Sequence, residues 1–160
     1  IKRLPDNGSI LVLGAGMGSF PLMLSMIKSD LTIYAVEADE DKLALAKNCA
    51  SCTAKISYIE SKPLDFEISQ TYNAVVLVDC LSTFENDQQL QIIRNCVTHS
   101  SLVLLSDIEY TRCSKIRLKL AGNELQKNKS YDLSDFEQLS EELCFSLIQS
   151  YDIIAISKME

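Results

Sequence analysis

Three glycines alternate with other residues directly after an apolar run, as Gly14, Gly16 and Gly18. Glycine lets the backbone turn sharply and approach a ligand, and a helix beginning behind such a loop offers unpaired N–H donors. Glu37 follows the next apolar run, 19 residues after Gly18, where an acid can accept hydrogen bonds from both hydroxyls of a ribose. Loop and acid together predict a site for an adenosine-containing cofactor. The alternative is a tight structural turn followed by a solvated glutamate.

Alternating apolar runs and amphipathic stretches must position these residues. Such alternation predicts an α/β fold with a parallel sheet and crossover helices. We expect strands at 10–13, 31–36, 56–59, 74–78 and 102–105, and helices at 20–28, 40–49 and 87–96. Asp39 is the expected N-cap of the second helix.

The C-terminal part has a different pattern. A helix is expected over 134–143, because Ser134 and Glu137 have the spacing of a capping box. Two apolar runs within 145–158 stand only a few residues apart. So short a link cannot hold a crossover, which predicts two antiparallel neighbouring strands.

Beyond the glycine spacing, several segments carry a family resemblance. Gly-x-Gly-x-Gly, Glu37 and the segment from Asp39 to Asn48 resemble motif I and the second strand of class I S-adenosylmethionine-dependent methyltransferases. The segment from Tyr72 to Val78 is similar to their fourth strand, with Asn73 at the usual Asp. The helix end before Phe145 is similar to theirs, with Cys144 for Gly, and the closing strands resemble their sixth and seventh.

The resemblance implies a three-layer α-β-α Rossmann-like sheet, mostly parallel with an antiparallel C-terminal strand pair, and S-adenosyl-L-methionine as cofactor. It implies that Glu37 holds the ribose, with Ala38 beside the adenine. Ser61 and Lys62 occupy the place of the residue that binds the adenine amine, although Lys62 departs from the usual Asp. The other implied cofactor contacts are Gly14, Ala15, Gly16 and Gly18 after the first strand, and Asp79, Cys80 and Leu81 after the fourth.

Asp79 is the candidate catalytic residue, because it ends a buried strand at the edge where open sheets bind ligands. It could position the acceptor or act as a general base, and the alternative is a cap on the following loop. The segment Asp-Cys-Leu-Ser lacks the Asn/Asp-Pro-Pro-Tyr signature of the resembling amino-methylating enzymes, which disfavours DNA adenine methylation. Asp107 and Glu109 could bind substrate or metal or lie in a solvated loop, and His99 is expected at a helix C-terminus.

Composition limits the partners. The net charge of −7 disfavours broad binding to nucleic acid. Six scattered cysteines, among them Cys80, Cys96 and Cys144, suit reduced core thiols in a cytoplasmic protein. The pair Cys49 and Cys52 has no second pair for zinc, and no apolar stretch approaches the length of a membrane span. The basic run 112–129 could attract an anionic substrate group or form a solvated face.

We expect residues 1–160 to form a single methyltransferase-like domain. About nine residues precede the first strand, which is too few for the N-terminal cap region that members of the resembling family usually have. The leading interpretation is a methyltransferase acting on a small-molecule acceptor. Two alternatives stay open: a non-catalytic methyltransferase-like domain of a larger protein, and an NAD(P)-dependent oxidoreductase domain, in which Ser19 would be the third small residue of the dinucleotide fingerprint.

Overall fold

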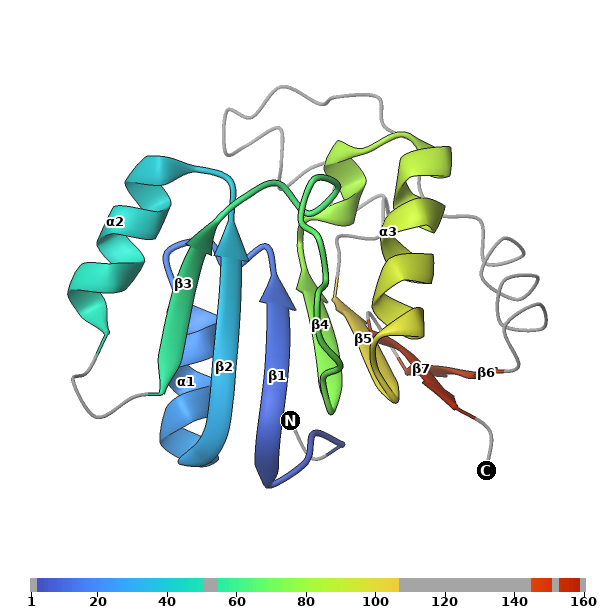
Figure 1. Cartoon of the computed structure of the whole chain (residues 1–160), viewed down its shortest axis with the longest axis horizontal. Helices are drawn as coiled ribbons and strands as arrows, with labels where there is room; N and C mark the ends of the chain where they lie inside the picture. Colours follow the sequence, from blue (N-terminus) through green and yellow to red (C-terminus); the bar gives the residue numbers. More distant parts are fainter. Residues whose placement is uncertain (1–2, 51–54, 107–144, 151–152, 159–160) are drawn as a thin grey trace.

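The computed structural model describes residues 3–50, 55–106, 145–150 and 153–158, the last two stretches as backbone alone. Seven strands form one sheet in the order β3-β2-β1-β4-β5-β7-β6 (Figure 1). The strands are β1 (Asn7–Leu13), β2 (Asp30–Glu37), β3 (Ile56–Glu60), β4 (Ala74–Val78), β5 (Leu102–Ser106), β6 (Phe145–Ser150) and β7 (Ile153–Lys158). The described helices are α1 (Ser19–Ile27), α2 (Glu40–Cys49), α3 (Asn86–Thr98) and the short 3-10 turn η1 (Leu81–Thr83).

Five of the strands are parallel, which confirms the predicted α/β sheet. β1 pairs with β2 and β4, β3 pairs with β2, and β5 pairs with β4. β7 lies between β5 and β6 and pairs antiparallel with both. Dinucleotide-binding Rossmann sheets have the order 3-2-1-4-5-6, so the insertion of β7 beside β5 sets this sheet apart from them.

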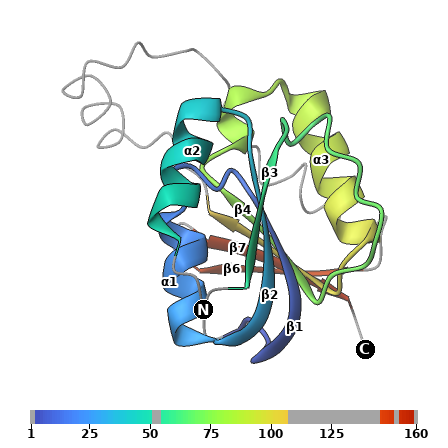
Figure 2. The ribbon, with the colours of Figure 1, turned by 60° about the vertical axis from the view of Figure 1, so that its left-hand side comes forward.

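The helices lie on both faces of the sheet. Figure 2 shows α1 and α2 on one side and α3 on the other. Successive side chains of a strand point to opposite faces, so β1 contributes Ile10 and Val12 to the core beneath α1, and Leu11 and Leu13 to the core beneath α3. All four are buried, which explains why this strand reads as a continuous apolar run.

Hydrogen bonds that sequence patterns miss decide where two elements begin. β1 starts at Asn7, three residues before the predicted start, because Asn7, Gly8 and Ser9 already pair with β2. α3 begins behind a capping box in which the Glu85 side chain accepts from the helix and the Gln88 side chain accepts from the Glu85 N–H. The first residues of β1 and the capping box of α3 are polar, so hydrophobic periodicity cannot locate either start.

Several predictions concern residues outside the described ranges. They are the helix over 134–143 with Ser134 and Glu137, the basic run 112–129, Asp107, Glu109, Cys52 and Cys144. Within the described ranges, no helix combines the length and the apolar character that crossing a membrane requires. The predicted core thiols Cys80 and Cys96 are buried.

Candidate functional site

The glycine loop follows β1 and is held between the ends of β2 and β4. The N–H groups of Gly14 and Ala15 both donate to the Val36 carbonyl oxygen, at 3.0 and 2.9 Å. Gly14 has a φ of 78°, and a Cβ there would lie 2.3 Å from the Val78 carbonyl oxygen. Only glycine both adopts this positive φ without strain and lacks a Cβ that would clash with that oxygen. Gly14 is therefore required by the packing of the strands themselves.

Glu37 ends β2, and its carboxylate fixes the loop. Oε2 accepts a 2.7 Å hydrogen bond from the Gly16 N–H. Oε1 accepts from the N–H groups of Ala38 and Asp39, both at 3.0 Å. Hydrogen bonds to a carboxylate are among the stronger ones in proteins. The carboxylate at the end of β2 thus lies against the glycine loop.

The other two loop glycines have different surroundings. A Cβ at Gly16 would meet no atom within 4 Å, whereas one at Gly18 would lie 2.8 Å from both Ala46 Cβ and the Tyr58 hydroxyl. Gly18, with a φ of 81°, is the N-cap of α1 and packs against α2 and β3. The Tyr58 hydroxyl is buried without a hydrogen-bond partner, and burial raises the pKa of this phenol. Gly16 alone of the three faces open space.

α2 begins beside Glu37. The Asp39 side chain accepts from the Lys42 N–H at 3.1 Å, as expected of an N-cap, and its other oxygen lies 3.4 Å from the Lys42 ammonium. The Lys42 backbone N–H is the main reason that the pKa of Asp39 lies below its ordinary value of 3.8. Asp39 and Lys42 therefore form a fixed polar pair at the start of this helix.

Asp79 follows β4 in a left-handed conformation, with a φ of 44°. A non-glycine residue in this region costs about 1 kcal/mol or more. Its N–H donates to the Ser106 carbonyl oxygen at 2.7 Å, which ties it to β5. The next residue, Cys80, is buried with its thiol 3.6 Å from the Leu13 carbonyl oxygen. The turn after β4 is thus fixed from both sides, against β5 and against β1.

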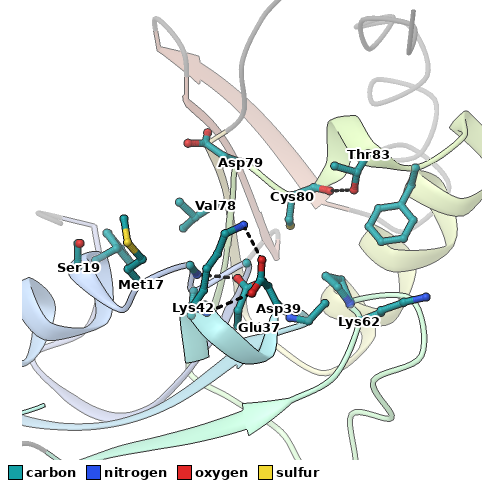
Figure 3. Close-up of a pocket in the computed structure, with 17 residues that line it drawn as sticks. Met17, Ser19, Glu37, Asp39, Lys42, Lys62, Val78, Asp79, Cys80 and Thr83 are labelled. Atoms are coloured by element: carbon teal, nitrogen blue, oxygen red, sulfur yellow. Dashed lines mark hydrogen bonds and ion pairs between the residues drawn. The ribbon is translucent and has the colours of Figure 1, made fainter. Parts of the chain in front are cut away.

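These elements enclose one cavity of about 840 Å³ at the carboxyl ends of β1, β2 and β4 (Figure 3). That volume falls within the range of pockets for cofactors and drug-sized ligands. Its lining comprises Gly14, Ala15, Gly16, Met17, Ser19, Phe20, Glu37, Ala38, Asp39, Lys42, Lys62, Pro63, Val78, Asp79, Cys80, Thr83 and Phe84.

Eight of the eleven residues expected around the cofactor line this cavity: Gly14, Ala15, Gly16, Glu37, Ala38, Lys62, Asp79 and Cys80. Three lie elsewhere. Gly18 packs against α2 and β3, Leu81 is fully buried in the core beneath α3, and the Ser61 hydroxyl donates to the Lys62 carbonyl oxygen outside the lining. The ends of the strands do not locate the side chains that other elements supply to the lining, namely Ser19 and Phe20 from α1, Lys42 from α2, and Thr83 and Phe84 from η1 and the residue after it.

Other candidates have structural surroundings. His99 is the C-cap of α3, as expected, and its Nδ1 lies 2.8 Å from the Asn95 carbonyl oxygen. Asn73 precedes β4, at the opposite end of the strand from the cavity, and its Oδ1 accepts from the Ser9 N–H at 2.9 Å. The described residues contain no cluster of three or more His, Cys, Asp or Glu side chains that could hold a metal ion.

Comparison with known proteins places this geometry in a fold. No family model and no curated protein sequence matches the chain. Similar solved structures include the magnesium protoporphyrin IX methyltransferase of Synechocystis with bound SAH (S-adenosylhomocysteine), at a TM-score of 0.76 and 14% identity over 99% of this chain and 77% of that one. The plantazolicin methyltransferase BpumL with SAH has a TM-score of 0.69 and 14% identity, over 94% of this chain and 76% of its own.

A third similar structure is CalO1, a methyltransferase in calicheamicin biosynthesis, in its SAH-bound form. Its TM-score is 0.71 at 14% identity, over 98% of this chain and 50% of that chain. At sequence identities this low, the structural similarity establishes a shared architecture alone. The chain has the fold of the class I S-adenosylmethionine-dependent methyltransferases.

Proposed function

We propose that the chain binds S-adenosyl-L-methionine in this cavity and transfers its methyl group to a small-molecule acceptor. The observation that carries the proposal is the contact between Glu37 and Gly16, at the edge of a cavity of about 840 Å³. An acid fixed against an open glycine loop is suited to hold a ribose. The solved structures that share the fold, with SAH bound, support the same ligand.

The residues of the cavity fit such a ligand. A Cβ at Gly16 would project into open space, so the loop leaves room where a ligand would pass. Glu37 would accept from ribose hydroxyls through the acceptor sites that its three N–H donors leave unused. Ala38 and Pro63 offer apolar surface for a purine, and Lys62 lies near them in the lining.

Asp79 is the proposed catalytic residue. When bound, S-adenosylmethionine supplies an electrophilic methyl carbon: the acceptor atom bonds to this carbon, the carbon–sulfur bond breaks, and its electron pair stays on sulfur. This in-line displacement depends mainly on positioning. The Asp79 carboxylate lines the cavity on a backbone fixed to Ser106. It can orient the acceptor and take its proton where the acceptor loses one.

Residues 1–160 would act as one domain in this proposal. The three described cysteines, Cys49, Cys80 and Cys96, are free thiols, and a cytoplasmic location stays a prediction.

Small-molecule acceptors fit the cavity better than nucleic acid does. The described charged residues of its lining are three acids and two lysines, which offer no cationic surface to a phosphate backbone.

Calorimetric titration of the full chain with S-adenosylmethionine, SAH and NAD tests the proposal. We expect micromolar binding of the two adenosyl ligands and none of NAD. Binding of NAD alone would instead select the oxidoreductase interpretation. Adenosyl binding without turnover of any compound in a broad acceptor panel would select the non-catalytic interpretation.

A further inference from the structure

The exposed apolar side chains are gathered on one side of the sheet. In the part of the chain that the structure describes, every exposed large hydrophobic residue belongs to the glycine loop, α1 or α2: Met17, Met23, Met26, Ile27 and Leu45. Both helices cover the same face of the sheet, and α3 covers the other (Figure 2). α3 adds no residue to this set, so the two outer surfaces of the molecule differ.

α1 is apolar on its outer side as well as on its inner side. Its nine residues include no charged side chain. Pro21 and Leu24 are buried. On the outer side, Met23, Met26 and Ile27 are 42%, 78% and 56% exposed. Residues three and four apart are neighbours on a helix surface, so these three form one continuous patch, the α1 patch. A helix that is apolar all round is normally covered on all sides.

The other two helices have the pattern expected of surface helices. α3 buries Ile93 and Cys96 and exposes Gln91 and Arg94. α2 buries its apolar side, and all of its charged residues are exposed. The α1 patch is therefore an exception among the described helices, which indicates that another surface covers it.

We propose that a second copy of this chain covers the α1 patch, so that two chains form a symmetric homodimer with α1 against α1. Each copy carries a net charge of −7, and like net charges keep proteins apart. α1 contains no acid, so two copies can meet there without bringing like charges of this helix together. Homodimer interfaces are more apolar than the rest of the surface, Met is enriched in interfaces, and a two-fold contact uses the same patch on both sides.

Two other occupants fit the α1 patch less well. A helix that lies on a lipid surface carries Lys or Arg on its polar side, and α1 has neither. The first cation after the helix, Lys28, is paired with Asp6. A partner recognised through charge would find no charged side chain on this helix. An uncharged patch on an acidic chain therefore fits a copy of itself best.

Sedimentation equilibrium of the full chain between about 1 and about 100 µM tests the proposal, and we expect the wild type to pass from monomer to dimer in this range. Met26→Lys places two ammonium groups in the contact and should weaken dimerisation at least about tenfold. Met26 is exposed and lies outside the cavity lining, and Lys suits the last turn of a helix. The variant should therefore stay folded, which circular dichroism verifies, and bind SAH like the wild type.

Gln91→Lys is the matched control. It changes the net charge by the same amount at an exposed position of α3, on the other face of the sheet, and should leave the dimer intact. Both substitutions reduce the net negative charge, so repulsion between whole chains would weaken neither dimer. Raising the salt concentration from about 0.05 to about 0.5 M screens that repulsion and should strengthen the wild-type dimer.

A wild type that stays monomeric at the highest concentration overturns the inference. A dimer that tolerates Met26→Lys as well as it tolerates Gln91→Lys does the same, and so does a dimer that salt dissociates. Pelleting of a monomeric chain with phosphatidylcholine vesicles would assign the α1 patch to a lipid surface instead. None of these results bears on the proposed function, because titration of the same proteins with SAH decides that separately.

Discussion

The backbone N–H of Gly16 donates a 2.7 Å hydrogen bond to Oε2 of Glu37, although 21 residues separate the two in sequence. This bond joins the loop after β1 to the end of β2. The loop conformation is therefore held before any ligand binds, and a ligand need not order it. Preorganisation of this kind lowers the entropic cost of binding.

Glu37→Ala should weaken both stability and ligand binding. The change leaves the partly buried N–H of Gly16 without its acceptor, which costs about 1–3 kcal/mol, whereas the N–H groups of Ala38 and Asp39 lose theirs at positions exposed to water. Urea unfolding measures this loss, and calorimetric titration with SAH should show at least about a tenfold loss of affinity.

Glu60 offers a matched control for that variant. It pairs in register with Glu37 on the neighbouring strand, yet it is exposed and lies outside the cavity. Glu60→Gln should keep wild-type stability and affinity. If Glu37→Ala binds SAH as tightly as Glu60→Gln does, Glu37 does not hold the ligand.

Gly14→Ala and Gly16→Ala should lower the free energy of unfolding by different amounts. A methyl group at Gly14 would lie 2.3 Å from the Val78 carbonyl oxygen and 2.8 Å from Cys80 Cβ, so we expect a loss of more than about 3 kcal/mol in unfolding free energy. At Gly16 the methyl meets nothing within 4 Å, and the left-handed φ alone costs about 1 kcal/mol. Thermal unfolding separates the two variants.

The same Gly16 variant should lose the ligand. Its methyl group projects from a residue that lines the cavity, so titration with SAH should give no measurable binding to a protein that is still folded. Wild-type affinity in folded Gly16→Ala is the result that excludes this loop as the binding surface.

The parallel part of the sheet could be predicted because its signal is local. β1, β2, β4 and β5 contain apolar runs, and α2 has its predicted bounds behind the Asp39 cap. Element ends depended on distant partners instead. The early start of β1 rests on pairing with β2 and on Asn73, which is 64 residues from Ser9. No window of sequence contains such a contact.

The residues of the site could likewise be predicted where they stand at strand ends, and not where they depend on distant elements. Gly14 and Asp79 directly follow strands and Glu37 is the last residue of one, so strand ends alone locate them at one edge of the sheet. Lys42 and Phe84 enter the cavity only through the orientation of α2 and the turn η1. The three glycines also look equivalent in sequence. Their different roles depend on Val78, open space and Ala46, which only the fold brings to them.

Asp39 should make stability depend on pH. Its pKa is lowered from 3.8, chiefly by the Lys42 backbone N–H. A lowered pKa means that the ionised acid stabilises the folded chain above the unfolded value and that this contribution disappears as the pH falls through the folded one. Urea unfolding from pH 7 to pH 3 should therefore show wild type more stable than Asp39→Asn near neutrality, with the two converging below about pH 4.

Asp41→Asn is the matched control for this comparison, because it removes an acid from the same first turn of α2 without touching the cap. A gap between wild type and Asp39→Asn that stays constant down to pH 3 contradicts the assignment of the cap to the ionised carboxylate.

Cysteine reactivity should follow burial. Burial raises the pKa of the Cys96 thiol to about 12, and Cys49 is exposed. The thiolate is the reactive form, so burial leaves very little of Cys96 ionised at pH 8. Iodoacetamide followed by peptide mass mapping should label Cys49 in the folded chain and Cys96 only after unfolding. Equal labelling of both in the native protein contradicts the buried position of Cys96.

Asn73 should matter for folding and not for ligand binding. Its Oδ1 accepts from the Ser9 N–H, and its carbonyl oxygen accepts from the Ser101 hydroxyl, at the end of the sheet opposite the cavity. Asn73→Asp keeps an acceptor and should change unfolding free energy little, whereas Asn73→Ala should lose about 1 kcal/mol, less if water replaces the contact. Both variants should bind SAH like the wild type. An affinity loss in Asn73→Asp at unchanged stability would mean that the amide acts on the cavity through β4.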